Sequence, residues 1–409
     1  MSDADSLKVP FSRPSIGKEE ENAVLAVMRS GWLTTGKTAA AFEQEFSQFL
    51  SKPVPGGTQS CCTINTAAPI CLAVNSNTSG MLLAMDACGI GPGTAVITTP
   101  YTFVSTAMCA RHLGADVFFA DIEKDSYSID PAAVEEILKN HTESKIKAVV
   151  PVHIAGNVCK MKELCSIAQK YGIRVIEDAA HSFPSRTGLG YAGTLGDVGV
   201  FSFYATKTIT TAEGGMVCTK DQKLARHMEV MRMNGMDRTA WDRYTSPRAS
   251  WEYDIIAAGY KFNMPDILAA IGREQLKKAD LFYEKRKHIV DVYNKAFAGL
   301  DFVQPPPDDE GNAWHLYLLR IIPEKLSIDR DAFARELQKQ GIGISVHFIP
   351  LFHFTYCKRL YPEFTPDRFP NAERQYSTTI TIPLWPDMTE KMAGQVIEAV
   401  IQTGVRHHV

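Results

Sequence analysis

The sequence predicts an α/β protein with a large domain, built on a mostly parallel central sheet flanked by helices, and a small C-terminal α+β domain. Between Leu72 and Val217, short apolar segments alternate with helical segments, which is typical of βαβ units. The Pro- and Asp-rich segment 304–312 separates this region from the last part of the chain. The chain has 409 residues, more than one ordinary domain. We expect a large domain over residues 1–300 and a small one over residues 301–409.

The N-terminal part predicts two helices and a loop. Residues 18–29 carry apolar side chains at helical spacing and end at Ser30-Gly31, a typical helix stop. Residues 38–50 place three phenylalanines on one side of a second helix. Residues 51–69 are rich in Pro, Gly, Thr and Cys, so we expect a loop there.

The middle of the chain supplies the alternating strands and helices of the central sheet. Six apolar segments are predicted as strands: Ala95–Thr98, Asp116–Ala120, Ala148–Val152, Arg174–Glu177, Val198–Phe203 and Met216–Thr219. Four helices are expected between them: Ser79–Cys88, Ser105–Leu113, Pro131–Lys139 and Lys160–Tyr171. The C-terminal part predicts a long helix from Pro265 to about Phe297 and then, in order, a strand over 314–321, a helix over 330–340, a strand over 343–347 and a helix over 389–403.

Composition and charge exclude several classes of protein. The chain is 45% hydrophobic and 22% charged, as in ordinary globular proteins. Its net charge of −3 provides no basic field for a nucleic acid, and no apolar run is long enough to span a membrane. The start of the chain lacks the pattern of a secretory signal. The nine cysteines form no C-x-x-C pair, so we expect no metal site and a reducing, cytoplasmic setting.

Two segments carry chemical groups just after predicted strands. Lys207 follows the strand that ends at Phe203, where a partly desolvated lysine can act as a Schiff-base nucleophile. Asp178 follows another strand and has His181 three residues on; an acidic residue there can hold a protonated pyridine nitrogen. Taken alone, each has an ordinary explanation: a solvated turn lysine, a helix N-cap and a structural histidine.

Two further segments complete the set. Residues 74–83, VNSNTSGMLL, place hydroxyl and amide side chains at a helix start, which suits a phosphate or simple N-capping. Phe103 comes after Pro100 and before the next helix, where an aromatic ring can stack on a planar cofactor or enter the core. A phosphate-type helix start, this aromatic residue, Asp-x-x-His and a later lysine, in this order, fit one cofactor, pyridoxal 5′-phosphate (PLP).

The sequence resembles the DegT/DnrJ family of sugar aminotransferases, PLP-dependent enzymes of fold type I. The resemblance covers nearly the whole chain and rests on these segments: PFSRPSIG at 10–17, SGWLTTG at 30–36, GIGPG at 89–93, EDAAH at 177–181, SFYATK at 202–207, EGG at 213–215, GYKFNM at 259–264, SVHFIP at 345–350 and IPLWPD at 382–387.

The resemblance implies a role for each matching residue around the cofactor. Lys207 would form the Schiff base and move the proton, Asp178 would pair with the pyridinium nitrogen, and His181 would contact the phenolic oxygen. Phe103 would stack on the ring. The phosphate would be held by a group of residues near the helix start and the later strand: Asn77, Thr78, Ser79 and Ser202.

The resemblance also implies partners. Lys261 or Asn263 would reach the phosphate bound by a second subunit, in a homodimer with shared active sites. The substrate cleft would be lined by Trp32, Thr34, Thr35 and His347. L-Glutamate would donate its amino group, and a nucleotide-linked keto sugar would accept it, in amino sugar biosynthesis. Arg238 and Arg243 are candidates to face the diphosphate.

The sequence departs from the family pattern at two points. Residues 52–70 are longer than the usual connection and unlike its short strand. The glycine of the family's phosphate motif is replaced by Asn77, which tolerates left-handed backbone better than most residues.

Four other functions share parts of these features. A deoxysugar dehydratase of the same fold would carry histidine in place of Lys207, and a dehydrogenase would carry G-x-G-x-x-G at a helix start. A keto-inositol acceptor is compatible with the motifs. A non-catalytic regulatory protein of the same fold would be expected to lose Lys207 or Asp178, and both are present.

Overall fold

The structure is a computed structural model that describes residues 8–54, 67–237, 251–307, 309 and 311–409. A seven-stranded sheet forms its centre, in the order β1-β9-β8-β5-β4-β2-β3. The strands from β8 to β3 pair in parallel, and β9 runs antiparallel to both of its neighbours. The strands have the following bounds: β1 Ile70–Val74, β2 Ala95–Thr98, β3 Asp116–Phe119, β4 Ile146–Val149, β5 Arg174–Asp178, β8 Val198–Ser202 and β9 Gly215–Thr219.

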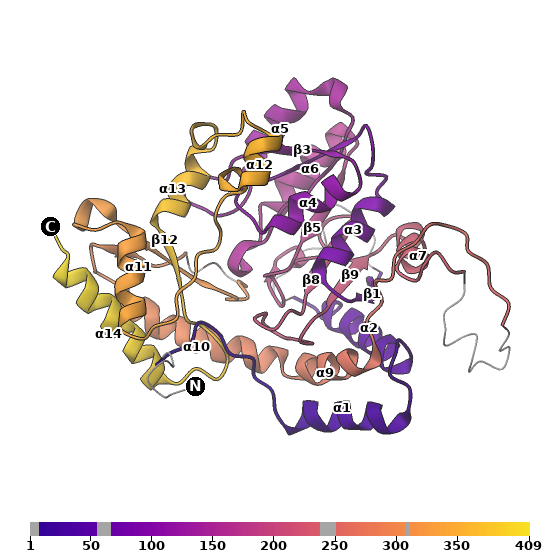
Figure 1. The fold of residues 1–409 in the computed structure, drawn as a ribbon, viewed down its shortest axis with the longest axis horizontal. Helices are drawn as coiled ribbons and strands as arrows, with labels where there is room; N and C mark the ends of the chain where they lie inside the picture. The colour runs from indigo at the N-terminus through magenta and orange to yellow at the C-terminus, as the bar shows by residue number, and fades with distance from the viewer. Residues whose placement is uncertain (1–7, 55–66, 238–250, 308, 310) are drawn as a thin grey trace.

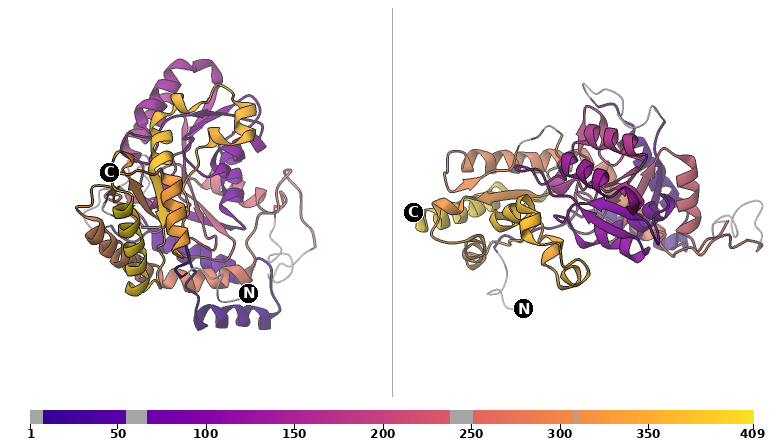
Figure 2. Two further views of the ribbon diagram at one scale, coloured as in Figure 1. Left: turned by 60° about the vertical axis from the view of Figure 1, so that its left-hand side comes forward. Right: turned by 90° about the horizontal axis from the view of Figure 1, so that it is seen from above.

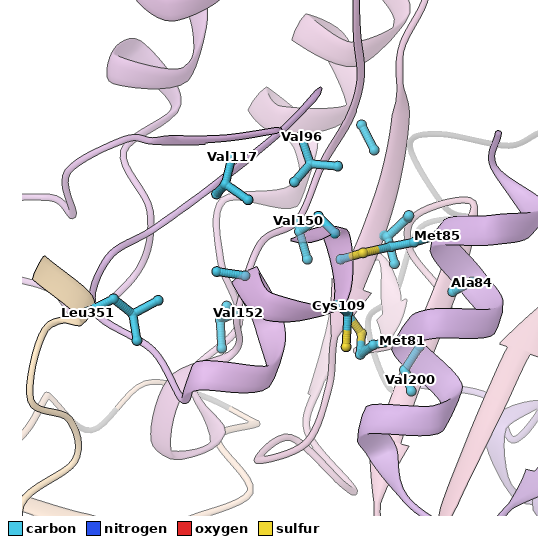
Figure 3. Packing of buried hydrophobic residues seen from close by; sticks show 14 of the residues in the cluster. Met81, Ala84, Met85, Val96, Cys109, Val117, Val150, Val152, Val200 and Leu351 are labelled. Atoms are coloured by element: carbon cyan, nitrogen blue, oxygen red, sulfur yellow. The ribbon is translucent and has the colours of Figure 1, made fainter. Parts of the chain in front are cut away.

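Helices cover both faces of this sheet (Figure 1). One face is packed against α3 (Asn77–Ala87), α4 (Val104–His112) and α7 (Gln222–Met231). The other face is packed against α2 (Lys37–Leu50), α5 (Pro131–Asn140), α6 (Met161–Tyr171) and α9 (Asp266–Lys277). Figure 3 shows the first face, where Met81 and Met85 of α3 lie in one cluster with Val96 of β2, Val200 of β8 and Val150, the residue after β4. The predicted α/β class with a mostly parallel sheet is confirmed.

The C-terminal part of the chain forms a second sheet with its own apolar cluster. Its strands β10 (Val303–Gln304), β11 (Tyr317–Ile321) and β12 (Thr379–Ile382) are antiparallel. Its helices are α11 Arg330–Lys339, α12 Thr355–Leu360, α13 Pro370–Thr378 and α14 Glu390–Arg406. Helices α11 and α14 lie at the end of the molecule opposite α7 (Figures 1 and 2). The domain boundary at residue 300 stays a prediction.

One strand was not predicted, and two predicted elements differ from the structure. The strand β1 lies at residues 70–74, where no strand was predicted, and it pairs in register with β9. The single long helix is wrong: α9 ends at Lys277 and α10 (Ala279–Phe297) begins anew at Ala279. Segment 343–347 forms no strand, because its Gly343 N–H bonds to Val9 and Ser345 makes an isolated bridge to Thr381.

An ion pair holds the residue between α9 and α10. Nζ of Lys278 donates to both carboxylate oxygens of Glu20, each at 2.8 Å, and Glu20 belongs to α1 (Lys18–Ser30). Glu20 is 1% exposed and also accepts hydrogen bonds from Gln275 and from the Gly17 N–H. The junction therefore fixes the N-terminal helix against the central region.

Two absences hold for the described residues. None of their helices is long and apolar enough to cross a membrane. They also contain no group of three or more His, Cys, Asp or Glu side chains placed to hold a metal ion.

Candidate active site

A cavity of about 450 Å³ lies where β5 and β8 end and α3 begins. Carboxyl ends of parallel strands are where open α/β sheets bind ligands. Eight of the residues predicted for the site line this cavity: Asn77, Thr78, Phe103, Asp178, His181, Ser202, Lys207 and His347. The fold thus brings together side chains that are far apart in the sequence.

Lys207 lies in the turn after β8, with its backbone N–H bonded to the carbonyl of Tyr204. Burial lowers the pKa of its amine to about 8, while the carboxylate of Asp178 acts in the opposite direction. A substantial fraction of the amine is therefore neutral near that pH. A neutral amine is the nucleophilic form of lysine.

Asp178 is the last residue of β5 and is 3% exposed. Its Oδ2 accepts a hydrogen bond of 2.7 Å from the Thr106 hydroxyl, and Oδ1 accepts one of 3.2 Å from the Ala180 N–H. Thr106 was not predicted as a site residue. Thr106 lies one helical turn after Phe103, and this spacing could have placed it beside the site.

His181 is buried and its hydrogen bond assigns its tautomer. Its Nδ1 accepts the backbone N–H of Ala155 at 3.3 Å, so the ring proton of the neutral form lies on Nε2. Burial, with smaller contributions from Lys207 and His347, lowers the pKa of His181 well below its usual value. His181 is therefore a neutral donor at Nε2.

The start of α3 is capped by its own side chains. Ser76 is the N-cap, and its Oγ accepts the Ser79 N–H at 3.1 Å. Ser79 is thereby placed outside the cavity lining, whereas Thr78 and Ser202 lie in it. Asn77 is the first helical residue and does not have a positive φ, so left-handed backbone is not required there.

The Asn77 side chain points to the sheet. Its Nδ2 donates to the carbonyl of Val200 at 3.0 Å and lies 3.5 Å from Oδ1 of Asp178. These contacts join the start of α3 to β8 and to the buried carboxylate. The side chain is thus already engaged within the protein.

Five predicted residues form a separate cluster that does not line the cavity. Nζ of Lys261 donates to Asn263 Oδ1, and Asn263 Nδ2 donates to the Thr35 hydroxyl, both at 2.5 Å. Trp32 Nε1 donates to the carbonyl of Thr35 at 3.2 Å, and the carbonyl of Thr34 accepts the Asp266 N–H. Asn263 also bridges to Val74, next to the start of α3.

The remaining candidates lie outside the description. Arg238 and Arg243 fall within residues 238–250, which the structure does not describe. The centre of the 52–70 segment, residues 55–66, is likewise not described.

Several cavity residues were missed by the sequence analysis. His315 and Phe348 line the cavity together with His347. The ring of Phe348 lies 5.5 Å from that of His181, and the ring of His315 lies 4.4 Å from it. No local pattern marks His315, which follows the linker at the start of a predicted strand. Phe348 is the next residue after His347 and could have been found from that neighbour.

Known proteins match this chain along nearly its whole length. The model of the DegT/DnrJ/EryC1/StrS aminotransferase family matches residues 14–401. An uncharacterized protein of Methanocaldococcus jannaschii, MJ1066, is 41% identical over 398 residues, which is 97% of each chain. The spore coat polysaccharide biosynthesis protein SpsC of Bacillus subtilis is 40% identical over 395 residues, which is 96% of each.

Solved structures agree in fold. Helicobacter pylori PseC, an aminotransferase involved in the biosynthesis of pseudoaminic acid, is 27% identical with a TM-score of 0.84, covering 97% of this chain and 99% of that one. Streptococcus pneumoniae Spr1654 in its PLP-form is 28% identical with a TM-score of 0.84 over 97% of this chain and 99% of that one.

Proposed function

This chain belongs to the DegT/DnrJ/EryC1/StrS aminotransferase family, and from that premise we propose that it transfers the amino group of L-glutamate to a nucleotide-linked keto sugar. The protein is a PLP-dependent aminotransferase of a sugar aminotransferase family. The names of SpsC and PseC, from polysaccharide and pseudoaminic acid biosynthesis, support an amino sugar as the product.

One observation carries the proposal: the amine of Lys207, its pKa lowered to about 8 by burial, shares a cavity with the buried carboxylate of Asp178 and the start of α3. These residues fit PLP, which needs an amine for its aldehyde, an anion for its ring nitrogen and donors for its phosphate. The bound cofactor supplies the aldehyde that carries the amino group and a ring that withdraws electrons.

Each cavity residue has a task in this scheme. Nζ of Lys207 holds the cofactor and moves the proton at the α-carbon of the donor. Asp178, oriented by the Thr106 hydroxyl, would hold the proton at the ring nitrogen. Nε2 of His181 would donate to the phenolic oxygen of the cofactor. Phe103 lines the cavity and is 57% exposed, so its ring would be available to stack on the cofactor ring.

The phosphate is assigned to the hydroxyls that line the cavity near α3. Thr78 and Ser202 line the cavity and would bind the phosphate together with backbone N–H groups at the start of the helix. Asn77 contributes through its backbone, because its side chain is bonded to Val200. Ser79 does not line the cavity but stabilises the start of α3, because its N–H donates to Oγ of Ser76.

We propose a homodimer in which the cluster of Lys261 and Asn263 faces the partner's cofactor phosphate. Burial lowers the pKa of Lys261, yet the cluster lies outside the cavity of its own chain. Trp32, Thr34 and Thr35 would then line a substrate cleft that two subunits complete. Exposed apolar side chains support an interface: Phe103, Val104, Tyr204, Trp251, Ile255 and Ile256.

The acceptor can be tested directly. The purified, PLP-loaded protein is mixed with ¹⁵N-labelled L-glutamate and a panel of nucleotide-linked keto sugars, with keto-inositols as the alternative acceptors. We expect mass spectrometry to find ¹⁵N in an amino sugar nucleotide. Label found in an aminoinositol instead would replace the proposed acceptor, and label in neither product would reject it.

A further inference from the structure

We propose that Cys71 and Cys218 are a site of reversible oxidation, at which a hydroperoxide joins the two thiols in a disulfide that links β1 to β9. The proposed transfer reaction uses neither side chain, so this inference does not depend on it. The two residues lie directly opposite each other in the antiparallel pair of strands, although they are 147 positions apart in the sequence. The register of the sheet therefore brings together two cysteines that no C-x-x-C pattern marks.

The two sulfur atoms are in close contact. Their Sγ atoms lie 3.1 Å apart, closer than the about 3.5–4.0 Å at which carbon atoms make an ordinary contact. A disulfide needs Cβ atoms about 3.5–4.5 Å apart, and facing residues of an antiparallel pair hold theirs about 4.5–5.5 Å apart. A small movement of the two side chains is therefore enough to form the bond, and the register of the strands does not have to change.

The surroundings of the pair assign a different role to each thiol. Both side chains are buried in the apolar cluster that packs α2 against the sheet. Burial raises the pKa of Cys218 well above its usual value, and its hydrogen bond with Cys71 acts in the same direction. Cys218 therefore keeps its proton, and Cys71 is assigned as the sulfur that attacks the oxidant.

The position of Cys71 in the sheet gives a small oxidant its route. Strand β1 is the outermost strand of the seven-stranded sheet, whereas β9 lies between β1 and β8. Ile70, the residue before Cys71, is exposed. An outermost strand opens locally more readily than an inner one, so hydrogen peroxide reaches Cys71 before Cys218.

The reaction balances with hydrogen peroxide as the oxidant. The sulfur of Cys71 attacks one peroxide oxygen, the O–O bond breaks, and the leaving oxygen departs as water with the proton of that thiol, which leaves a sulfenic acid. The sulfur of Cys218 then attacks the sulfur of Cys71, the S–O bond breaks, and a second water carries away the proton of Cys218. The two thiols together lose two electrons and two protons, and a dithiol such as dithiothreitol reverses the bond.

The bond links the two strands close to where they meet the cavity. Strand β1 ends at Val74, two residues before Ser76, the N-cap of α3. Val74 pairs with Gly215, which directly follows the lining residue Gly214. A covalent link between these strands restricts the unfolded chain, because it closes a long loop. We therefore expect the oxidised protein to resist unfolding more than the reduced protein does.

The test treats the PLP-loaded protein with hydrogen peroxide and then alkylates the remaining thiols in urea. Mass spectrometry of a non-reducing digest identifies linked peptides, and urea denaturation with and without dithiothreitol compares stability. The variants are Cys71→Ala and Cys218→Ala, each of which removes one of the two sulfurs. Cys357→Ala is the matched control, because Cys357 is a buried cysteine of α12 in a different apolar cluster.

We expect the wild type to yield a linked pair of peptides that contains Cys71 and Cys218 and is about 2 Da lighter than its two parts. The urea midpoint should rise by about 1 M on oxidation, and dithiothreitol should reverse both changes. Cys71→Ala and Cys218→Ala should lose the linked pair and the rise, whereas Cys357→Ala should keep both.

Three results would overturn the assignment. The first is that alkylation finds both thiols unreacted in the wild type after peroxide treatment. The second is a sulfinic or sulfonic acid at Cys71 in place of the linked pair, which would show that Cys218 does not reach it. The third is a rise of the urea midpoint that persists in the variants. If one variant does not fold, the other decides, and the linked peptides of the wild type need neither.

Discussion

The hydroxyl of Thr106 donates a hydrogen bond of 2.7 Å to Oδ2 of Asp178, joining the first turn of α4 to the end of β5. Thr106 is itself fully buried, and its Oγ1 lies 2.9 Å from the Thr102 hydroxyl. The carboxylate assigned to the ring nitrogen is thus oriented by a side chain that does not line the cavity.

The substitution Thr106→Val keeps the volume and removes this hydrogen bond. We expect the fold to lose about 1 kcal/mol of stability and the L-glutamate half-reaction to slow by about 10-fold, because Asp178 loses its orientation. Stopped-flow absorbance measures the rate. Thr98→Val is the matched control: it removes a buried hydroxyl that donates to the carbonyl of Val150 at 2.8 Å, and it should leave the half-reaction unchanged. Equal slowing in both variants would contradict the role.

The substitution Asp178→Asn should leave PLP binding measurable while slowing the half-reaction by about 100-fold or more. A neutral amide cannot hold a proton at the ring nitrogen as a carboxylate does. Single-turnover kinetics with L-glutamate measure this effect. A rate equal to the wild type would show that Asp178 is only structural.

Capture of PLP by the cofactor-free protein should follow the ionisation of Lys207. Burial lowers the pKa of this amine to about 8, and the protonated form does not attack an aldehyde. The rate should therefore rise about tenfold per pH unit below about pH 7 and level off above about pH 9. Stopped-flow absorbance between those values tests this. A rate that still rises steeply beyond pH 10 would show an ordinary exposed lysine.

The junction between α9 and α10 predicts a stability effect far from the site. Lys278→Met leaves the carboxylate of Glu20, 1% exposed, without its charged partner, and should cost about 2–3 kcal/mol. Lys277→Met removes an exposed lysine with an i,i+3 partner and should change stability by less than about 0.5 kcal/mol. Urea denaturation compares the two. Equal losses of stability in the two variants would contradict a stabilising role of the Lys278–Glu20 ion pair.

Local sequence patterns were sufficient to predict many strands of the sheet and several residues of the cavity. The strand β2 lies at its predicted bounds because a buried parallel strand is apolar throughout. Lys207, Asp178 and His181 were found because each follows such a strand, and parallel strands end at the same edge.

The missed features depend on contacts between distant parts of the chain. Strand β1 is defined by its pairing with β9, about 145 residues later, and follows a stretch of sequence with weak strand propensity. The helix break at Lys278 depends on Glu20, whereas the apolar period continues through it. The backbone of His315 is held by hydrogen bonds with Ala155 and Arg286, and no local sequence pattern around His315 predicts these contacts.

The visible absorption spectrum of the PLP-loaded protein, recorded before and after addition of L-glutamate, tests the central claim most directly. We predict a visible absorption band, typical of PLP bound to a lysine, that bleaches with L-glutamate in the wild type. In Lys207→Ala the band should be absent and turnover lost while the fold persists, because the nucleophile is removed. Near-normal transamination by Lys207→Ala, or a wild-type band that L-glutamate leaves unchanged, would contradict the account.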